Sequence, residues 1–243
     1  MGVKLERKKP KCLLTSIVYR FSKMRLPISD KLKFRIFLNL EWIFERLCTE
    51  QASAVYGSDG IISKKSTVQF LSKHIKPDDT VLDLGCGYGA ISYNVSMIAK
   101  KVVGVDYNTK AIEAAQKKYQ RENLRFIHEE ALNYLRKSEE RFSVLILSHV
   151  LEHIDNPKDF LSAYSGYFEH IFIEVPDFDR TFLNHFRQEQ NIAQLYTDAD
   201  HVTEFDRDEM HSLLSDLNLE ALQAEYRYGV QRFWVKRKGN GIN

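Results

Sequence analysis

The most constraining feature of this sequence is a short apolar segment that runs directly into three glycines at alternate positions. Val81–Leu84 has the length and composition of a buried strand, and Gly85, Gly87 and Gly89 follow it at once. A helical pattern begins at residue 90. Glycine permits positive φ angles and a close approach of the backbone to a ligand. The strand, loop and helix together predict a nucleotide-type site at the end of a parallel strand.

The chain around this loop alternates between short apolar strands and helices. We expect strands at Val81–Leu84, Val102–Asp106, Arg125–His128, Val144–Leu147 and Ile171–Val175. Helical patterns cover about 62–75, 90–100, 109–121, 131–138, 157–168 and 207–217. Two late strands, about 222–228 and 232–237, lie so close together that they should form an antiparallel hairpin. This alternation predicts an α/β fold with a doubly wound, mostly parallel sheet.

The N-terminal region has a different pattern. Residues 12–21 and 31–48 place apolar side chains at helical spacing and predict two amphipathic helices. We therefore divide the chain into an N-terminal helical extension or cap over residues 1–55 and an α/β domain over residues 56–243. Two helices this short cannot bury a core of their own, so we expect them to cover part of the main domain.

Charge is unevenly placed along the chain, although the formal net charge is only +2. Residues 1–50 hold twelve Lys and Arg and five Asp and Glu, a net charge of about +7. Such a region can contact nucleic acid, a membrane surface or an anionic substrate, or it can be a solvated helix face. We expect no transmembrane segment and no signal peptide. The three cysteines show no paired spacing, which favours a reducing, cytoplasmic location without a zinc site.

An acidic residue ends the second predicted strand. Asp106 lies seventeen residues after Gly89, where its carboxylate can accept hydrogen bonds from both hydroxyls of a ribose. The glycine spacing is G-x-G-x-G, whereas the loop that binds the pyrophosphate of NAD has the spacing G-x-G-x-x-G. Asp83, directly before the loop, would repel a pyrophosphate but suits a cationic ligand. These features disfavour an NAD oxidoreductase.

The segment 83–89 resembles the first motif of class I S-adenosylmethionine (SAM)-dependent methyltransferases, and the resemblance runs from about residue 61 to the end of the chain. It implies a Rossmann-like sheet of seven strands whose last strand is antiparallel, with SAM as the cofactor. In this family Asp106 would bind the ribose, Tyr107 and Asn108 the adenine, and Glu130 the adenine amino group. The residues implied in cofactor binding are Asp83, Gly85, Cys86, Gly87, Gly89, Asp106, Tyr107, Asn108, Glu130, Ala131 and Ser148.

Histidines after the fourth predicted strand are candidates for catalysis. Segment 148–153 is similar to the family segment that passes beneath the methyl donor, and it places His149 and His153 four residues apart. An unperturbed imidazole titrates near pH 6.5 and can take a proton from a hydroxyl at neutral pH. We expect His153 to be the general base, with His149 or His201 orienting the acceptor.

Two alternatives to this role remain open. Hen-type RNA 2′-O-methyltransferases carry a similar Glu-x-x-Glu-His segment and a later histidine, and they use a divalent metal there. His149 replaces the first glutamate of that pattern, so we expect no metal. In the other alternative, the segment Leu151–His153 only ends a strand and caps a turn.

The resemblance favours a small-molecule or glycan acceptor methylated on oxygen or nitrogen. DNA amino-methylating enzymes carry an Asn/Asp-Pro-Pro-aromatic motif after the fourth strand, and this chain does not. An RNA-end 2′-O-methyltransferase and a SAM-binding regulatory module without catalysis are the alternatives, so nucleic acid is a possible but not a favoured partner. We expect residues 12–50 to form part of the acceptor pocket and the aromatic stretch 176–205 to be its lid. The sequence does not indicate an oligomeric state.

Overall fold

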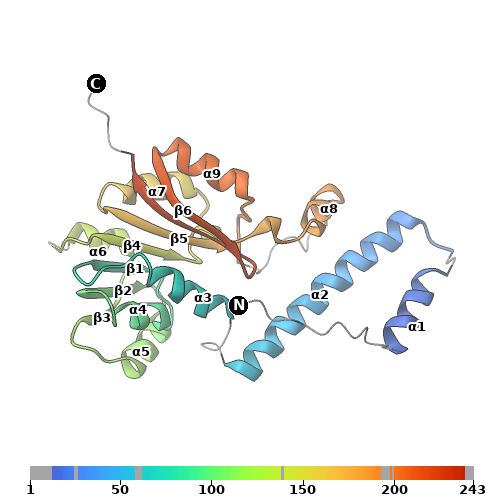
Figure 1. Cartoon of the computed structure of the whole chain (residues 1–243), viewed down its shortest axis with the longest axis horizontal. Coiled ribbons are helices and arrows are strands. Elements are labelled where there is room, and N and C mark those ends of the chain that lie inside the picture. Colours follow the sequence, from blue (N-terminus) through green and yellow to red (C-terminus); the bar gives the residue numbers. More distant parts are fainter. Residues whose placement is uncertain are drawn as a thin grey trace.

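The computed structural model describes residues 13–24, 27–57, 62–137, 140–192, 198 and 200–238. Within these residues a seven-stranded sheet has the order β3-β2-β1-β4-β5-β7-β6 (Figure 1). The strands are β1 Thr80–Leu84, β2 Lys101–Asp106, β3 Leu124–His128, β4 Val144–Ser148, β5 His170–Pro176, β6 Leu219–Arg227 and β7 Val230–Arg237. Strand β7 alone runs in the opposite direction to the other six strands. The doubly wound, mostly parallel sheet with an antiparallel last strand is therefore confirmed.

The strand order reverses beside β1, which pairs with β2 on one side and with β4 on the other. The chain winds outward to β3 and then returns to build the other half of the sheet from β4. In such sheets the crevice for a ligand opens at the carboxyl ends of the strands where the order reverses. The glycine loop after β1 and the histidine segment after β4 consequently face the same crevice.

Helices cover both faces of the sheet because successive residues of a buried strand point to opposite sides. Val81 packs with α3 Ile62–Leu71, α4 Ala90–Val95 and α5 Thr109–Lys118. Its neighbour Leu82 belongs to the cluster formed with α6 Ala131–Lys137, α7 Pro157–Ser165 and α9 Arg207–Asp216. Each face therefore has its own core, and strands such as β4 are apolar on both sides.

Two helix starts follow from capping residues that are visible in the sequence. The side chain of Asn156 accepts a hydrogen bond from the Asp159 N–H, and Pro157 occupies the first turn of α7. Asp206 and Glu209 form a reciprocal capping box at the start of α9. These caps satisfy backbone N–H groups that would otherwise lack a partner at the start of each helix.

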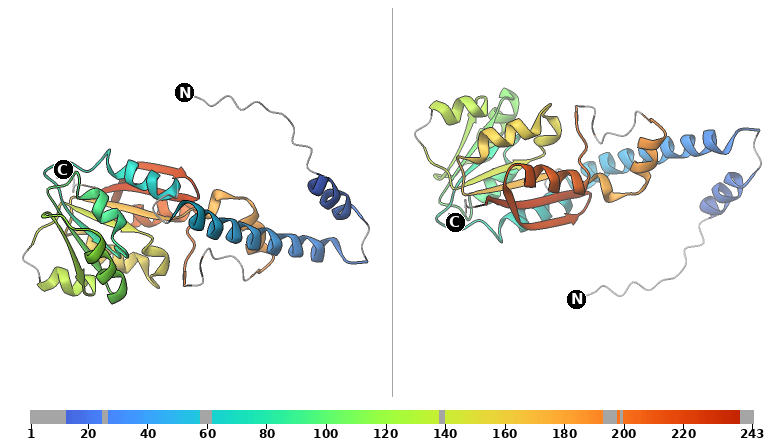
Figure 2. Two further views of the ribbon diagram at one scale, coloured as in Figure 1. Left: turned by 90° about the horizontal axis from the view of Figure 1, so that it is seen from below. Right: turned by 90° about the horizontal axis from the view of Figure 1, so that it is seen from above.

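The N-terminal helices extend away from the sheet (Figures 1 and 2). Helix α1 spans Leu13–Ser22, and α2 spans Asp30–Tyr56, a length of about 40 Å at 1.5 Å per residue. The second helix continues past the expected end at residue 48 because no glycine or proline interrupts it before Gly57. None of the described helices is long and apolar enough to cross a membrane.

The expected lid, 176–205, is partly helical rather than a loop throughout. It contains the short helix η3 Phe178–Arg180 and α8 Leu183–Glu189. Helix α8 packs against α2: the buried Arg187 donates to the Leu38 carbonyl and pairs with Glu41. The helical structure of this segment is thus stabilised by a partner far away in the sequence.

A buried acid lies directly before the glycine loop. Asp83 is 2% exposed, and the Ser92 hydroxyl donates a 2.5 Å hydrogen bond to its carboxylate. Burial raises the pKa of Asp83 to about 7; the charge of Asp106 acts in the same direction and the Ser92 hydrogen bond opposes it. The protonated form of Asp83 is therefore favoured by folding.

Asp83 should make folding stability depend on pH. Because its folded-state pKa exceeds the ordinary 3.8, its stabilising contribution is present below pH 3.8 and is lost as the pH rises through about 7. Relative to Asp83→Asn, the free energy of unfolding of the wild type should fall by on the order of 4 kcal/mol across this range. Urea titrations of both proteins at a series of pH values measure the effect. Parallel stability profiles would contradict the assigned pKa.

Candidate functional site

A cavity of about 590 Å³ opens at the carboxyl ends of β1, β2 and β4. Its volume lies within the usual range for small-molecule sites. Among the residues that line it are six of the predicted cofactor-binding residues and two of the predicted catalytic residues: Gly85, Gly87, Asp106, Tyr107, Asn108, Glu130, His149 and His153. The cavity also has apolar walls, formed in part by Val150, Phe160 and Tyr164.

The glycine loop needs glycine for both backbone conformation and space. Gly85 and Gly89 have φ angles of +72° and +79°, in the left-handed region that side chains disfavour. A Cβ atom at Gly85 would lie 2.8 Å from Val150 Cγ2, and one at Gly89 would lie 2.5 Å from the Phe126 ring. The loop is therefore held close to β3 and to the segment after β4.

Asp106 is held by the backbone on both of its oxygens. The Gly87 N–H donates to Oδ2 and the Asn108 N–H donates to Oδ1, each at 2.8 Å. The residue is 9% exposed and lines the cavity. An ionised carboxylate has about four acceptor positions, so two remain for hydroxyl groups of a ligand. The side chain of Asn108 also caps α5.

Other predicted cofactor residues lie outside the cavity lining. Asp83 lies beneath the loop, and the half-buried Cys86 is beside it. Burial raises the pKa of the Cys86 thiol, and the charges of Asp83 and Asp106 add to this effect, which keeps the thiol neutral. The Ser148 hydroxyl is turned toward Glu174, to which it donates at 2.8 Å. Ala131 begins α6.

His149 has an unusual backbone and contacts two buried carboxylates. Its φ angle is +56°, and its N–H donates to the Glu174 carbonyl at 2.9 Å. Nδ1 lies 2.8 Å from Glu152 Oε1, while Nε2 lies 3.7 Å from Glu174 Oε1. Burial opposes the charged imidazole, but the Glu152 hydrogen bond and the two carboxylates together raise its pKa. The side chain remains about half exposed.

The segment after β4 forms the short helix η2 Leu151–His153, which excludes His149. His149 and His153 therefore reach one cavity through a turn rather than by sharing a face of an α-helix. The backbone N–H groups of Val202 and Thr203 donate to the Glu152 carbonyl and bring His201 to the same turn. All three predicted histidines thus gather around Glu152.

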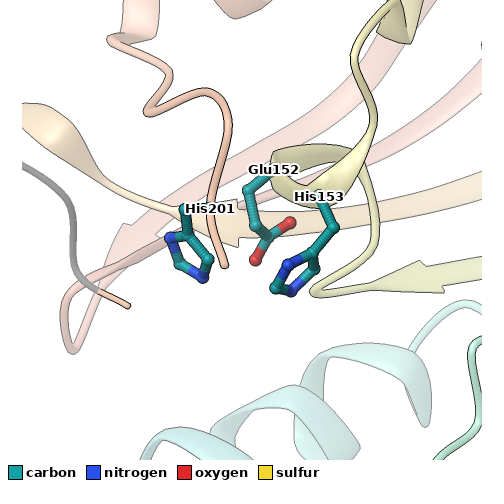
Figure 3. Close-up of side chains that lie close together, drawn as sticks. All are labelled: Glu152, His153 and His201. Carbon is teal, nitrogen blue, oxygen red and sulfur yellow. The ribbon is translucent and has the colours of Figure 1, made fainter. Parts of the chain in front are cut away.

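Glu152, His153 and His201 point toward one another (Figure 3). One potential ligand atom from each lies within 4.8 Å of the others. Glu152 is fully buried, and its Oε2 has no hydrogen-bond partner among the residues that the structure describes. His201 Nδ1 lies 2.9 Å from Glu204 Oε1, an arrangement that leaves Nε2 open as a ligand. Two imidazoles and a carboxylate suit a divalent transition metal, so these residues could hold one.

A second cavity of about 410 Å³ lies between α2 and the β6–β7 turn. His149 lines this cavity as well as the first one. Helix α2 contributes Trp42, Glu45 and Arg46, and the turn contributes Tyr228. The wall is closed by ion pairs: Arg180 binds Glu45 with both terminal nitrogens, and Arg46 donates to Asp198 at 2.8 Å.

Sequence reasoning missed the carboxylates that organise these histidines. Glu174 is 2% exposed and accepts hydrogen bonds from Thr67, Ser148 and Arg232. A charged residue inside the apolar strand Ile171–Val175 was the available signal, because a buried carboxylate needs partners. Asp200, which also lines the first cavity, had no comparable signal.

Comparisons with known proteins agree with this geometry. Residues 59–224 match the profile of a family described as a methyltransferase domain. The chain is 34% identical over 87 residues to the mitochondrial ubiquinone biosynthesis O-methyltransferase of Schizosaccharomyces pombe, covering 33% of this chain and 31% of that protein. It is 31% identical over 117 residues to an uncharacterised RNA methyltransferase of Mycoplasma mobile, covering 47% and 28%. The chain thus spans less than a third of the length of these two relatives.

Solved structures with bound SAM or its product share the fold. Magnesium protoporphyrin IX methyltransferase from Synechocystis PCC 6803 with bound SAH has a TM-score of 0.56 at 16% identity, covering 93% of this chain and 95% of that chain. A complex of DhpI with SAM and HEP has a TM-score of 0.57 at 15% identity, covering 80% and 97%. These structures show a shared fold. Because the profile match covers more than half of its residues, the chain belongs to the methyltransferase-domain family.

Proposed function

We propose that this chain is a SAM-dependent methyltransferase that methylates a hydroxyl oxygen, or an amine nitrogen, of a small molecule or glycan. The observation that carries the proposal is the position of His149, which lines both the 590 Å³ and the 410 Å³ cavity. A base at the junction of two cavities can take the proton of an acceptor group at the point where the methyl group arrives. We assign the larger cavity to SAM and the smaller one to the acceptor.

The first cavity supports the SAM assignment through groups that match the parts of a nucleoside. The free acceptor positions of Asp106 suit the two ribose hydroxyls. Tyr107 and Asn108 line the region proposed for the adenine, and Glu130 is proposed to accept from its amino group. SAM supplies a reactive methyl group on a positively charged sulfur. The protein's part is to position both partners and exclude water.

Residues beneath the loop are proposed to support the cofactor without lining its cavity. Asp83 holds Ser92 of α4 and lies behind Gly85 and Cys86. A bound cation above the loop would favour the ionised form of Asp83, directly or through water. Ser148 is proposed to act through Glu174, which also contacts His149.

The geometry supports His149 as the base better than His153, the residue favoured by the sequence. When the Glu152 carboxylate accepts the hydrogen bond at Nδ1, the proton of neutral His149 is on Nδ1 and Nε2 is free to accept one. His153 lines only the first cavity and has its Nδ1 near Asp200. We propose that His153 and His201 position Glu152 and the acceptor.

Helix α2 is proposed to close the acceptor pocket. Trp42, Glu45, Arg46 and Thr49 of α2 line the second cavity, which supports the α2 part of the expectation for residues 12–50. No described residue of α1 lines either cavity, so that part of the expectation has no support. The cap over residues 1–55 would then complete the site of the domain over residues 56–243. The segment 176–205 supplies Arg180 and Asp198 to the same wall, in keeping with a lid.

Asp106→Ala should weaken SAM binding by roughly ten- to a hundredfold, because a hydrogen bond to a charged group contributes about 1.5–3 kcal/mol. Calorimetric titration with SAM measures the change. Asp216→Ala is the matched control, because Asp216 forms only a surface ion pair with Lys158. An Asp106 variant with an unchanged dissociation constant would remove the carboxylate from the proposed ribose site.

His149→Gln should lower kcat by about 10²–10⁴-fold, as expected for loss of a general base, with SAM affinity nearly unchanged. Single-turnover assays and SAM titration separate the two effects. His185→Gln is the control, because His185 also pairs with a carboxylate, Asp179, but lines neither cavity. Turnover with the control should match the wild type.

Two results would contradict the His149 assignment. A greater loss of turnover in His153→Gln than in His149→Gln would return the base to His153. Inactivation of the wild type by a chelator, reversed by a divalent metal and absent in His201→Ala, would favour a metal held by Glu152, His153 and His201. Such a metal would activate the acceptor hydroxyl as a Lewis acid. We expect turnover to be insensitive to chelators.

The acceptor class is tested by measuring SAM consumption with sugars, phenols, amines and RNA. We expect turnover with a hydroxyl- or amine-bearing small molecule or glycan. RNA is the second candidate, because an RNA methyltransferase is among the relatives and residues 1–50 are basic. Turnover with RNA alone, weakened by salt, would replace the proposed acceptor. SAM binding without turnover on any acceptor would favour a regulatory module.

A further inference from the structure

The outer face of α2 carries an uncovered apolar stripe. The inner face contacts the main domain through residues such as Leu38, Glu45 and Arg46. On the opposite face seven large apolar side chains are 41–61% exposed: Leu32, Ile36, Phe37, Leu40, Ile43, Phe44 and Leu47. This outer stripe is about 22 Å long. A helix with apolar residues on both faces is normally covered on both, so the stripe indicates a partner.

Helix α1 also exposes apolar side chains. Leu13, Ile17, Val18 and Tyr19 are 55–77% exposed. Both views of Figure 2 place α1 to one side of the outer end of α2 and clear of the sheet. The domain that holds the two cavities therefore leaves these side chains of α1 uncovered.

Positive charge is concentrated in the N-terminal part of the sequence. Residues 1–35 contain eleven Lys and Arg but only two acidic residues. Arg20 and Lys23 lie at the end of α1, and Lys31, Lys33 and Arg35 lie in the first turns of α2. Lys33 pairs with Asp30, one of the two acids. Apolar side chains beside clustered cations are the pattern of helices that lie in the interface of an anionic bilayer.

We propose that α1 and the outer stripe of α2 dock on the surface of an anionic phospholipid bilayer. A second copy of the chain fits the stripe less well, because the basic segments of two copies would repel each other. RNA could neutralise the cations but would leave the aliphatic side chains in water. This inference does not depend on the acceptor proposed above.

Docking would also place the acceptor side of the molecule near the lipid. Trp42 projects from α2 into the second cavity, on the side opposite the stripe. An α-helix with its side chains is about 10–12 Å across. The bilayer surface and the cavity would therefore be separated by little more than one helix.

The proposal is tested by flotation of the full chain with vesicles of phosphatidylcholine alone or mixed with phosphatidylglycerol. The wild type should bind the mixed vesicles, and added salt should weaken binding. Ile43→Glu should lower the partition coefficient by about tenfold or more, because a charge replaces an inserted apolar group. Leu222→Glu is the matched control: Leu222 on β6 is 44% exposed, as is Ile43.

Retained SAM affinity shows that each variant is folded, since none of these residues lines the first cavity. Leu40→Glu, at a 41% exposed position one turn away, repeats the test if Ile43→Glu does not fold. Any of four results would overturn the proposal. They are no binding of the wild type, equal binding of wild type and stripe variants, a wild-type dimer that Ile43→Glu dissociates, and binding of RNA but not of vesicles.

Discussion

The buried ion pair between Glu174 and Arg232 joins β5 to β7, where the sheet changes from parallel to antiparallel pairing. Arg232 of β7 is fully buried and donates from Nε to Glu174 of β5 at 2.5 Å. Burying two charges carries a desolvation penalty of several kcal/mol per ion, so such a pair is tolerated only when its other polar atoms also have partners. Here Thr67 of α3 and Ser148 of β4 donate to Glu174, and Arg232 also pairs with Glu225. Removing one partner of such a pair typically costs about 3–5 kcal/mol.

Glu174 also contacts His149, through both its backbone and its side chain. The Glu174 carbonyl accepts the His149 N–H, and its side chain lies near His149 Nε2. Glu152 holds the other ring nitrogen, and its own carbonyl holds the segment that carries His201. The left-handed backbone of His149 is unfavourable for a residue with a side chain, and it persists because these contacts over-determine it. Strain of this kind is typical of functional sites, and here it lies at the junction of two cavities.

Much of the sheet and of the first cavity could be predicted from local patterns. The first five strands agree with their apolar runs to within one or two residues, and the loop from Gly85 to Gly89 lies where the glycines required it. The late strands begin two or three residues earlier than expected, because β6 and β7 pair beyond their apolar centres. Helix α8 was missed because its polar residues, such as Arg187, are held in a helix by packing against α2. The full length of α2 was missed as well.

The sequence by itself determined the alternation of strands and helices, the glycine loop and the place of Asp106. Each depends on side-chain periodicity or backbone freedom within a few consecutive residues. Only the tertiary structure decided that His149 faces both cavities and that Glu152, His153 and His201 converge. It also decided that α2 lines one cavity while leaving an apolar face uncovered. These contacts join residues far apart in the chain, and they depend on strand order and helix packing, which no local pattern encodes.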